Sequence, residues 1–348
     1  MHFASDNWAG VADEITAALR RSAGGFCTAY GESPDDRALE QTFNDLFETQ
    51  VNLFFVGTGT AANALALTAV NRPGGFVFCH QNSHLIEDEC GAPEYFTGGA
   101  RLDPIAGDNG KMQPSALDAA IARFDPSFVH HGQPMAISVT QATECGTVYS
   151  IEELQAIAAI AKRHRLPLHM DGARFANALV HLDASPADAT WRAGVDLLSF
   201  GGTKNGCWCA EALLVFNDSM AESMPYLRKR AAQLFSKTRF ITAQFSAYLH
   251  EGLWLRLASH ANAMAKRLAD ALGTHKSVRL AWQPQSNEVF VVMPKTLADR
   301  LQAAGANFYP WPVTDDVRGS MEPGEGLYRL VTSFATEPSH VDDFVRLL

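Results

Sequence analysis

The sequence predicts an α/β fold with a mainly parallel central sheet, followed by a smaller α+β region. Short apolar runs alternate with longer helical segments through the first two thirds of the chain. The alternation stops near residue 250, and no internal repeat or low-complexity segment interrupts it. Strands separated by helices of this length pair in parallel and are covered by helices on both faces.

The large sheet is expected from apolar runs that are too short for helices. Strands are predicted at residues 51–55, 75–79, 135–141, 166–171, 195–200 and 211–216. Helices are predicted between them at 61–70, 115–124 and 150–165. The last of these begins with Ser150 and has Glu153 three residues later, which is the pattern of a capping box.

A smaller C-terminal domain is expected after the boundary. We place the N-terminal arm and large domain at residues 1–250 and the small domain at residues 251–348. A long helix at 253–272 opens the second part, and strands follow near 278–282, 288–293 and 327–334. The first thirty residues have weak periodicity and are expected to form an arm.

Composition limits the classes of partner. The chain has 348 residues, of which 47% are hydrophobic and 19% charged, enough for one large and one smaller domain. Its formal net charge of -10 argues against nucleic acid or an anionic membrane as a partner. No apolar run is long enough to span a membrane, and the first residues lack a secretory signal. Six scattered cysteines predict a reduced, cytoplasmic protein rather than a disulfide framework.

Three predicted strand ends carry residues suited to chemistry. In VGTGTAAN, residues 56–63, glycines precede a helix N-terminus, which suits a phosphate or simply a tight turn. In HMDGARFANA, residues 169–178, Asp171 ends a strand and Arg174 follows, as an active pair or as a surface cap with a solvated arginine. In LLSFGGTKNG, residues 197–206, Lys204 is a phosphate contact, a surface charge or a Schiff-base lysine.

Together these three strand ends meet the needs of one cofactor, pyridoxal 5′-phosphate. Its phosphate binds a helix N-terminus, its ring nitrogen needs a carboxylate and its aldehyde needs a lysine. The order phosphate loop, Asp171, Lys204 therefore predicts this cofactor. Neither a Walker A loop nor a dinucleotide fingerprint matches the first of the three segments.

The chain resembles the low-specificity L-threonine aldolases, in a bacterial branch of that family. The likeness runs from Phe3 to beyond Arg239 and resumes at LYRLVTSF, so it covers most of the chain. The matching segments are FASDN (3–7), AYG (29–31), NLFFVGTGTAANALAL (52–67), HLIEDECGAPEYF (84–96), TQATECGTVY (140–149), LHMDGARFANA (168–178), and FGGTKNG with AEALLVF (200–216).

The resemblance implies a pyridoxal-phosphate-dependent, transferase-like fold of the aspartate aminotransferase type. It also implies a homotetramer built from two dimers. The implied reaction is retro-aldol cleavage of L-threonine or L-allo-threonine to glycine and acetaldehyde, catalysed by a carbon–carbon lyase. The partner is thus a small amino acid.

The resemblance also implies roles for individual residues near the cofactor. Lys204 would bind the cofactor aldehyde, Asp171 the pyridinium, and His84 would stack on the ring. The backbone of Gly59, Thr60 and Ala61 would cradle the phosphate, with Arg174 and Arg239 close by.

Substrate contacts are implied in the same way. Arg174 and Arg329 would bind the substrate carboxylate, Arg329 as the better clamp, and Ser5 would contact substrate. Tyr30 would reach in from a neighbouring subunit. His130 or His131 would lie near the substrate hydroxyl, and His84, His130 and His131 all remain candidates for the catalytic base.

The chain departs from the family pattern at two places. The segment ESPDD after Gly31 replaces the usual pair of acids, which predicts a repositioned loop. CWCA follows Gly206 where small or apolar residues are usual, and Trp208 either packs in the core or narrows the pocket. We predict no metal site, either at His80 and His84 with the acids after them or at the cysteine pair in CWCA.

Other functional classes remain open from the sequence. A phenylserine aldolase, a β-eliminating lyase or an aminotransferase would use the same scaffold, because fold alone does not select the reaction. A binding protein without catalysis is the remaining alternative, which the joint presence of Lys204, Asp171 and Arg329 disfavours.

Overall fold

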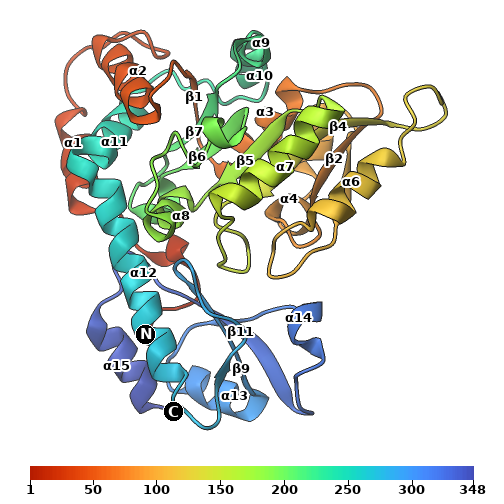
Figure 1. Cartoon of the computed structure of the whole chain (residues 1–348). Helices are drawn as coiled ribbons and strands as arrows, with labels where there is room; N and C mark the ends of the chain where they lie inside the picture. Colours follow the sequence, from red (N-terminus) through yellow and green to blue (C-terminus); the bar gives the residue numbers. More distant parts are fainter.

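The computed structural model describes residues 1–348, except for the side chains of residues 315 and 316. A seven-stranded sheet forms the large part of the molecule, in the order β1-β7-β6-β5-β4-β2-β3, with helices on both faces (Figure 1). Its strands are β1 Asn52–Val56, β2 Gly75–His80, β3 Arg101–Ile105, β4 Gln133–Thr140, β5 Leu168–Gly172, β6 Leu197–Gly201 and β7 Glu211–Val215. The six strands expected from the sequence are confirmed within a few residues at each end.

Two features of this sheet were not expected. Strand β3 has the sequence RLDPI, whose charges and proline hide it from pattern analysis, and it lies at the sheet edge, where proline is tolerated. Strand β7 runs antiparallel to both β1 and β6, whereas the other strand pairs are parallel. The link from β6 to β7 spans only residues 202–210, which is too short for a parallel crossover.

Helices and short 3-10 segments surround the large sheet. They are η1 Asp6–Trp8, α1 Asp13–Arg21, α2 Pro34–Phe47, α3 Gly59–Ala69, α4 His84–Glu87, α5 Ala92–Thr97, α6 Pro114–Ala122, α7 Ile151–His164, α8 Phe175–Leu182, η2 Trp191–Ala193, η3 Thr203–Asn205, α9 Asp218–Ala221, α10 Met224–Arg230, α11 Arg239–Leu249 and η4 His250–Gly252. The first thirty residues thus contain a helix, α1, as well as extended chain.

Two helix starts show how local sequence sets this arrangement. The predicted capping box at α7 is confirmed, because Ser150 Oγ accepts from Glu153 N and Glu153 Oε2 accepts from Ser150 N. In ESPDD, Ser33 and Asp36 form a second capping box that starts α2. The unusual acids after Gly31 therefore begin a helix.

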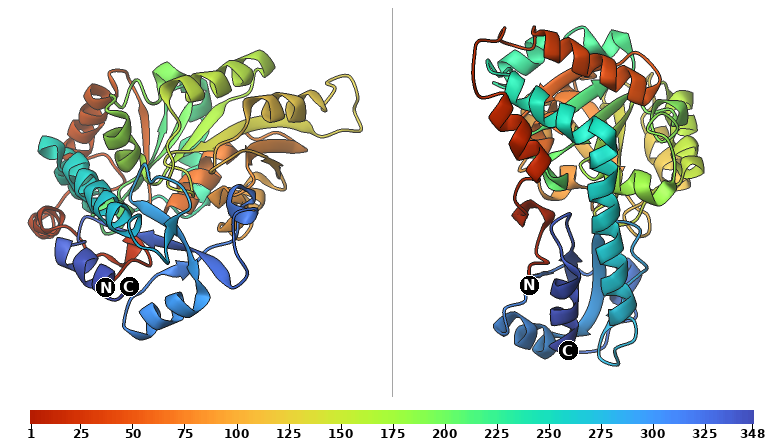
Figure 2. Two further views of the ribbon diagram at one scale, coloured as in Figure 1. Left: turned by 60° about the horizontal axis from the view of Figure 1, so that its bottom comes forward. Right: turned by 90° about the vertical axis from the view of Figure 1, so that its left-hand side faces the viewer.

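A four-stranded antiparallel sheet forms the smaller part, in the order β10-β11-β9-β8. Its elements are α12 Leu253–Leu272, β8 Arg279–Leu280, β9 Glu288–Pro294, α13 Lys295–Ala303, β10 Tyr309–Pro310, α14 Asp315–Arg318, β11 Glu325–Val331 and α15 Pro338–Arg346. Helix α12 packs on α8 of the large part and on α15 and β9 of the small part, and links the two (Figure 2). We propose the division into domains at residues 250 and 251, just before this helix.

The N-terminal residues join the small sheet rather than the large one. Phe3 is fully buried in the core of the small part. Its backbone N–H donates to Asn307 O, and its backbone oxygen accepts from Val331 N. Both chain ends lie in this part of the molecule (Figure 1). The chain then enters the large part through η1, so the segment before α1 contacts both.

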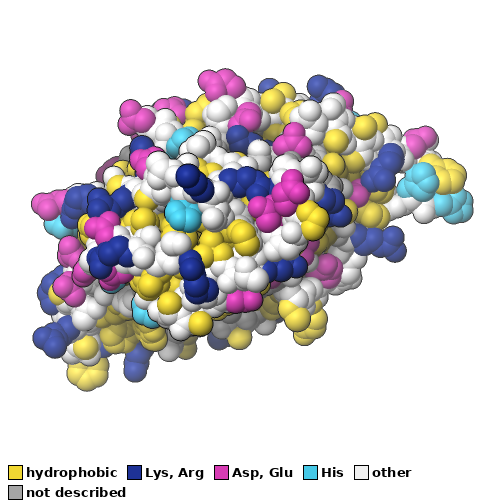
Figure 3. Space-filling view, turned by 90° about the horizontal axis from the view of Figure 1, so that it is seen from below, with side chains coloured by type: hydrophobic (Ala, Val, Ile, Leu, Met, Phe, Trp, Pro, Cys, Tyr) yellow, Lys and Arg dark blue, Asp and Glu magenta, His cyan; other side chains and the backbone are white. Residues whose placement is uncertain are grey.

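No helix among the described residues has the length and apolar character needed to cross a membrane. On the face in Figure 3, acidic and basic side chains are interspersed and do not form a patch of one sign.

A buried histidine in the central sheet should make stability depend on pH. His169 on β5 lies between Ser138 Oγ, 2.9 Å from Nδ1, and Ser199 Oγ, 3.0 Å from Nε2. Burial lowers the pKa of His169 to about 4. The unfolded chain therefore gains a proton as pH falls below about 6.5, whereas the folded chain stays neutral until about pH 4.

We expect the contribution of His169 to the free energy of unfolding to be at its maximum above pH 6.5. This contribution should fall by roughly 3 kcal/mol between pH 6.5 and pH 4. Urea unfolding at a series of pH values would measure this for the wild type and for His169→Gln, which cannot titrate. The wild-type free energy of unfolding should fall more steeply than that of the variant between pH 6.5 and 4. Parallel curves would contradict the assignment.

Candidate active site

A pocket of about 260 Å³ opens where the carboxyl ends of β1, β5 and β6 meet. Ligands of α/β sheets gather at this edge. The pocket is lined by Asn7, Gly57, Thr58, Gly59, Thr60, Asn63, His84, Asp171, Ala173, Thr203, Lys204 and Glu211. The three strand ends singled out in the sequence therefore converge on one site.

The first wall is the turn from β1 into helix α3. Thr58 is the N-cap of this helix, and its Oγ1 accepts from Ala61 N at 3.1 Å. The amides of Gly59 and Thr60 stand in the first turn, where backbone N–H groups have no acceptor within the helix. The amides of Gly59 and Thr60 are therefore available to bind an anion, whereas the amide of Ala61 is already bonded to Thr58.

The second wall is the end of β5, where Asp171 is buried. Asn63 Nδ2 donates to Asp171 Oδ2 at 2.8 Å, and Ala173 N donates to Oδ1 at 3.0 Å. A carboxylate has about four acceptor positions, so further ones remain for a donor in the pocket. Asp171 is thus fixed in place and is still able to accept a hydrogen bond from a ligand.

His84 forms the third wall, at the start of α4. Its Nδ1 lies 3.0 Å from Oε1 of the buried Glu89, which also accepts from Asn63 Nδ2. The hydrogen bond with Glu89 raises the pKa of His84. With Nδ1 held by Glu89, Nε2 is the nitrogen left to act on a ligand.

Lys204 lies on η3, in a loop whose glycines have a packing role. A side chain on Gly201 would collide with the backbone of Ala173, and one on Gly202 with the backbone of Ala210. Gly206 has a φ of 102°, which disfavours other residues. Gly201 therefore lets the start of the lysine loop lie close against Ala173, just after the strand that carries Asp171, and the lysine and the aspartate line one pocket.

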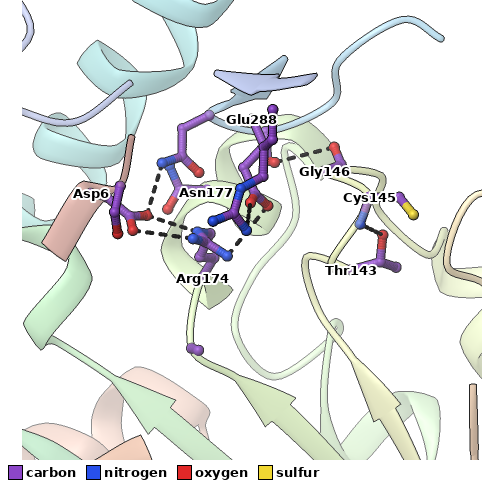
Figure 4. A network of polar contacts seen from close by, with 12 residues as sticks. Asp6, Thr143, Cys145, Gly146, Arg174, Asn177 and Glu288 are labelled. Atoms are coloured by element: carbon purple, nitrogen blue, oxygen red, sulfur yellow. Dashed lines mark hydrogen bonds and ion pairs between the residues drawn. The ribbon is translucent and has the colours of Figure 1, made fainter. Parts of the chain in front are cut away.

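A buried ionic network lies beside the pocket (Figure 4). Arg174 donates to Asp6 through Nε at 2.7 Å and Nη2 at 3.1 Å, and its Nη1 lies 3.3 Å from Glu288 Oε2. Burial would lower the pKa of Arg174, but these carboxylates outweigh it and raise the pKa. Arg174 does not line the pocket itself. It anchors the segment that contains Asp6 and the pocket residue Asn7.

Arg329 joins this network from β11. Its Nη1 lies 3.4 Å from Glu288 Oε1, and its guanidinium stacks on Trp311 at 4.2 Å from the ring centre. Its Nε is buried and has no hydrogen-bond partner among the described residues. Burial raises the pKa of Glu288, against the effect of the two arginines. Like Arg174, Arg329 is absent from the lining of the pocket, although its Nε remains an unpaired donor within the described part of the chain.

Three other predicted residues lie outside the pocket of their own chain. Ser5 caps η1 by accepting from Asn7 N at 3.2 Å, one turn from the pocket wall. Tyr30 is exposed, with Lys229 Nζ over its ring. Arg239 donates to the backbone oxygens of Gly24 and Gly25 and lines a larger groove between α1, α2 and α11.

His130 and His131 are not brought to this pocket either. Both are exposed on the loop before β4, next to Phe128. The other end of β4, at Thr140, pairs with Asp171, so the histidines lie a strand length away, roughly 25 Å. The family resemblance implies that one of these histidines lies near the substrate, and within one protomer neither of them reaches the pocket.

Trp208 is 64% exposed and is absent from the pocket lining, so it does not narrow the pocket within this chain. No group of three or more His, Cys, Asp or Glu side chains among those described is arranged to hold a metal ion.

Sequence reasoning missed several polar residues around the site. They are Asp6, Asn63, Glu89, Glu144, Glu211 and Glu288, and all are less than 9% exposed. One signal was available for two of them, because Glu211 and Glu288 are single acids at the start of otherwise apolar strands. A charge at such a position is costly unless it has a partner or a function.

The pocket suits pyridoxal 5′-phosphate on the chemistry of its donors and acceptors. The first turn of α3 offers amides for the phosphate, Asp171 offers an acceptor for a protonated ring nitrogen, and Lys204 offers an amine for the aldehyde. The two carboxylates that accept from Asn63 fix its orientation, and its buried Oδ1 has no partner among the described residues. The site therefore also holds an unused acceptor for a bound molecule.

Comparisons with known proteins agree with this geometry. Residues 2–296 match the family model described as beta-eliminating lyase. The chain is 41% identical to a low specificity L-threonine aldolase from Pseudomonas aeruginosa, over 99% of this chain and 96% of that protein. It is 40% identical to one from another Pseudomonas, over 97% and 94%. The solved structure of Leishmania major threonine aldolase superposes with a TM-score of 0.91 at 28% identity, over 99% and 98%.

Proposed function

Because this chain belongs to the low-specificity L-threonine aldolases of the beta-eliminating lyase family, we propose that its Lys204 pocket cleaves L-threonine and L-allo-threonine. The products are glycine and acetaldehyde, and the cofactor is pyridoxal 5′-phosphate. The observation that carries the proposal is the meeting of Lys204, Asp171 and the first turn of α3 in one pocket.

The roles of these residues follow from their chemistry. When bound, pyridoxal 5′-phosphate supplies an electron-accepting ring that takes up the electron pair released when the Cα–Cβ bond breaks. Lys204 Nζ is the amine that would hold the cofactor aldehyde. Asp171 keeps a proton on the ring nitrogen, because a buried carboxylate favours the charged pyridinium. The amides of Gly59 and Thr60 bind the phosphate, as a helix N-terminus does.

His84 is the base that we assign to the substrate hydroxyl. It lines the pocket, and Glu89 holds its Nδ1, which leaves Nε2 to receive the hydroxyl proton. The raised pKa strengthens His84 as a proton acceptor. His130 and His131 lie at the other end of β4 in this chain, which favours His84 over them.

The direct test is product analysis on purified protein supplied with pyridoxal 5′-phosphate. L-threonine and L-allo-threonine are added separately, and glycine and acetaldehyde are quantified. We expect both products in equal amounts from at least one diastereomer. A protein that binds the cofactor but releases neither product would overturn the aldolase assignment, and phenylserine cleavage and amino transfer would then be assayed.

Arg329 should set the affinity for substrate, since its Nε is unpaired and its guanidinium is held on Trp311. Charge-assisted hydrogen bonds to a carboxylate are strong, so Arg329→Gln should raise the KM for L-threonine by about tenfold to a hundredfold. The affinity for pyridoxal 5′-phosphate should stay near that of the wild type. Arg346→Gln, at an exposed ion pair on α15, serves as the matched control. A KM unchanged by Arg329→Gln would refute the clamp.

We also propose a homotetramer built from two dimers, in the cytoplasm. Two residues that the family resemblance assigns to the site, Tyr30 and Arg239, lie outside the pocket of their own chain, and a neighbouring subunit would give them a place. None of the six cysteines, all of which the structure describes, is in a disulfide, in keeping with a reducing compartment.

A further inference from the structure

Glu211 lies at the junction of the two loops that bind the cofactor. As the first residue of β7, it pairs with Val56 at the end of β1 and with Gly201 at the end of β6. Its side chain therefore stands where the phosphate loop and the Lys204 loop begin. It is 6% exposed and lines the pocket.

The contacts of Glu211 put a carboxyl group beside the anion cradle. Thr203 N donates to Oε1 at 3.2 Å. Oε2 faces the first turn of α3, since a methyl group placed on Gly59 would lie 4.0 Å from it. A phosphate bound by the amides of Gly59 and Thr60 would thus have a buried carboxyl group as its neighbour.

The charges around Glu211 do not neutralise it. Five titratable groups from several elements interact electrostatically with the Glu211 carboxyl group: Lys204, Asp171, Cys207, Cys209 and Tyr248. Lys204 is the one cation among these groups, and none of the described ion pairs joins it to Glu211. Burial raises the pKa of Glu211 to about 7, although Thr203 and Lys204 act in the opposite direction. Glu211 can therefore gain a proton near neutral pH.

Two anions side by side in a pocket of low dielectric constant repel each other strongly, and one shared proton removes this repulsion. A phosphate monoester has its second pKa near about 6 and is mostly a dianion above neutral pH. The proton must then come from solvent and reside on the carboxyl group, which becomes a hydrogen-bond donor.

We propose that Glu211 is protonated when the cofactor is bound and donates a hydrogen bond to its phosphate, so that cofactor binding takes up one proton. This proposal rests on the proposed function, because it takes the phosphate to lie at the first turn of α3. One O–H bond forms on a carboxylate oxygen of Glu211 and one breaks in the hydronium ion or buffer acid that donates the proton; no bond of the cofactor forms or breaks. The alternative role of Glu211 is structural, since Oε1 accepts from the Thr203 amide.

The variant Glu211→Gln separates these two roles. Its side-chain amide would keep an oxygen for the Thr203 amide and an N–H donor for the phosphate, but it cannot titrate. The experiment therefore uses full-length protein stripped of cofactor, as wild type, Glu211→Gln and Glu222→Gln. Glu222 is exposed at the end of α9 and provides the control. The probes are pyridoxal 5′-phosphate and pyridoxine 5′-phosphate, which lacks the aldehyde and so cannot bond to Lys204.

Association constants are measured by calorimetry between pH 6.5 and 9. The association constants of the wild type and of Glu222→Gln should fall about tenfold for each pH unit above 7. The association constant of Glu211→Gln should not show this decrease. Repeating the titration at pH 8 in buffers of different ionisation enthalpy counts protons directly. Wild-type protein should take up close to one proton more than Glu211→Gln.

Two results would overturn the proposal. The first is an equal pH slope in wild type and Glu211→Gln, which would leave Glu211 with a structural role only. The second is the absence of proton uptake by the wild type with pyridoxine 5′-phosphate, a result that needs no variant to fold. In both cases the cofactor still binds, so the proposed function stands. Wild-type protein that binds neither probe would overturn the proposed function and this proposal together.

Discussion

Lys204→Ala should abolish cleavage of L-threonine and leave the fold intact. The loop does not depend on the lysine side chain, because Asn205 anchors it by donating to Tyr248 Oη and to Trp254 O, both at 2.8 Å. Loss of the amine removes the group that holds the cofactor aldehyde, so the rate should fall by about a thousandfold or more. The measurements are acetaldehyde release, the absorbance of lysine-bound cofactor, and the melting temperature.

The control for this variant is Lys276→Ala, at an exposed lysine of the small part. It should keep both activity and absorbance. If Lys204→Ala retained wild-type turnover, the pocket would not be the active site. A loss of turnover accompanied by unfolding would leave the cause open, so the melting temperature should be within a few degrees of wild type.

Asp171→Ala should also cost orders of magnitude in rate, for a different reason. Without the carboxylate the ring nitrogen loses its proton, and the ring then accepts electrons poorly. We expect kcat to fall by about a hundredfold to ten-thousandfold. The substitution also removes the acceptor for Asn63 Nδ2 and Ala173 N, which should cost about 1–3 kcal/mol of stability.

Asp171→Asn separates the electronic effect from the structural one. Asparagine has the same shape and keeps one acceptor for the Ala173 amide, but it has no charge to stabilise the pyridinium, and its Nδ2 cannot accept from Asn63 Nδ2. It should therefore resemble Asp171→Ala in kcat and have a melting temperature between those of Asp171→Ala and the wild type. A near-normal kcat for Asp171→Asn would show that charge at this position is dispensable.

Local features of the sequence were sufficient for much of the fold. Six of the seven strands of the large sheet are short apolar runs, and Ser150 and Glu153 predict the start of α7. The convergence of Asp171 and Lys204 follows from a general property of parallel sheets, whose strand ends meet at one edge. These predictions rest on contacts within a few residues or on topology.

The ionic network beside the pocket could not be predicted in the same way. It joins Asp6, Arg174, Glu288 and Arg329, which are far apart in the chain and come together only when η1, α8, β9 and β11 pack. No periodicity or spacing marks such a pairing. Arg174 was therefore expected in contact with ligand, whereas its guanidinium is bonded to Asp6 and Glu288.

The histidines show another limit of sequence reasoning. The family resemblance implied that His130 or His131 lies near the substrate, but both precede β4 and lie at the opposite sheet edge from Asp171. The two ends of a strand face different surroundings, so residues that precede β4 cannot lie beside residues that follow it. The opposite end of β4 has Glu144, which is buried and acts electrostatically on His84 and Arg174.

The antiparallel strand β7 has a consequence for how the protein is made. It lies between β1 and β6. Strand β1, which leads into the phosphate loop, therefore has no neighbouring strand until residues 211–215 have been synthesised. Contacts between such distant segments form slowly, and domains generally fold as units during synthesis. The pocket, which also needs Lys204 and Glu211, is therefore complete only after most of the large domain has been synthesised.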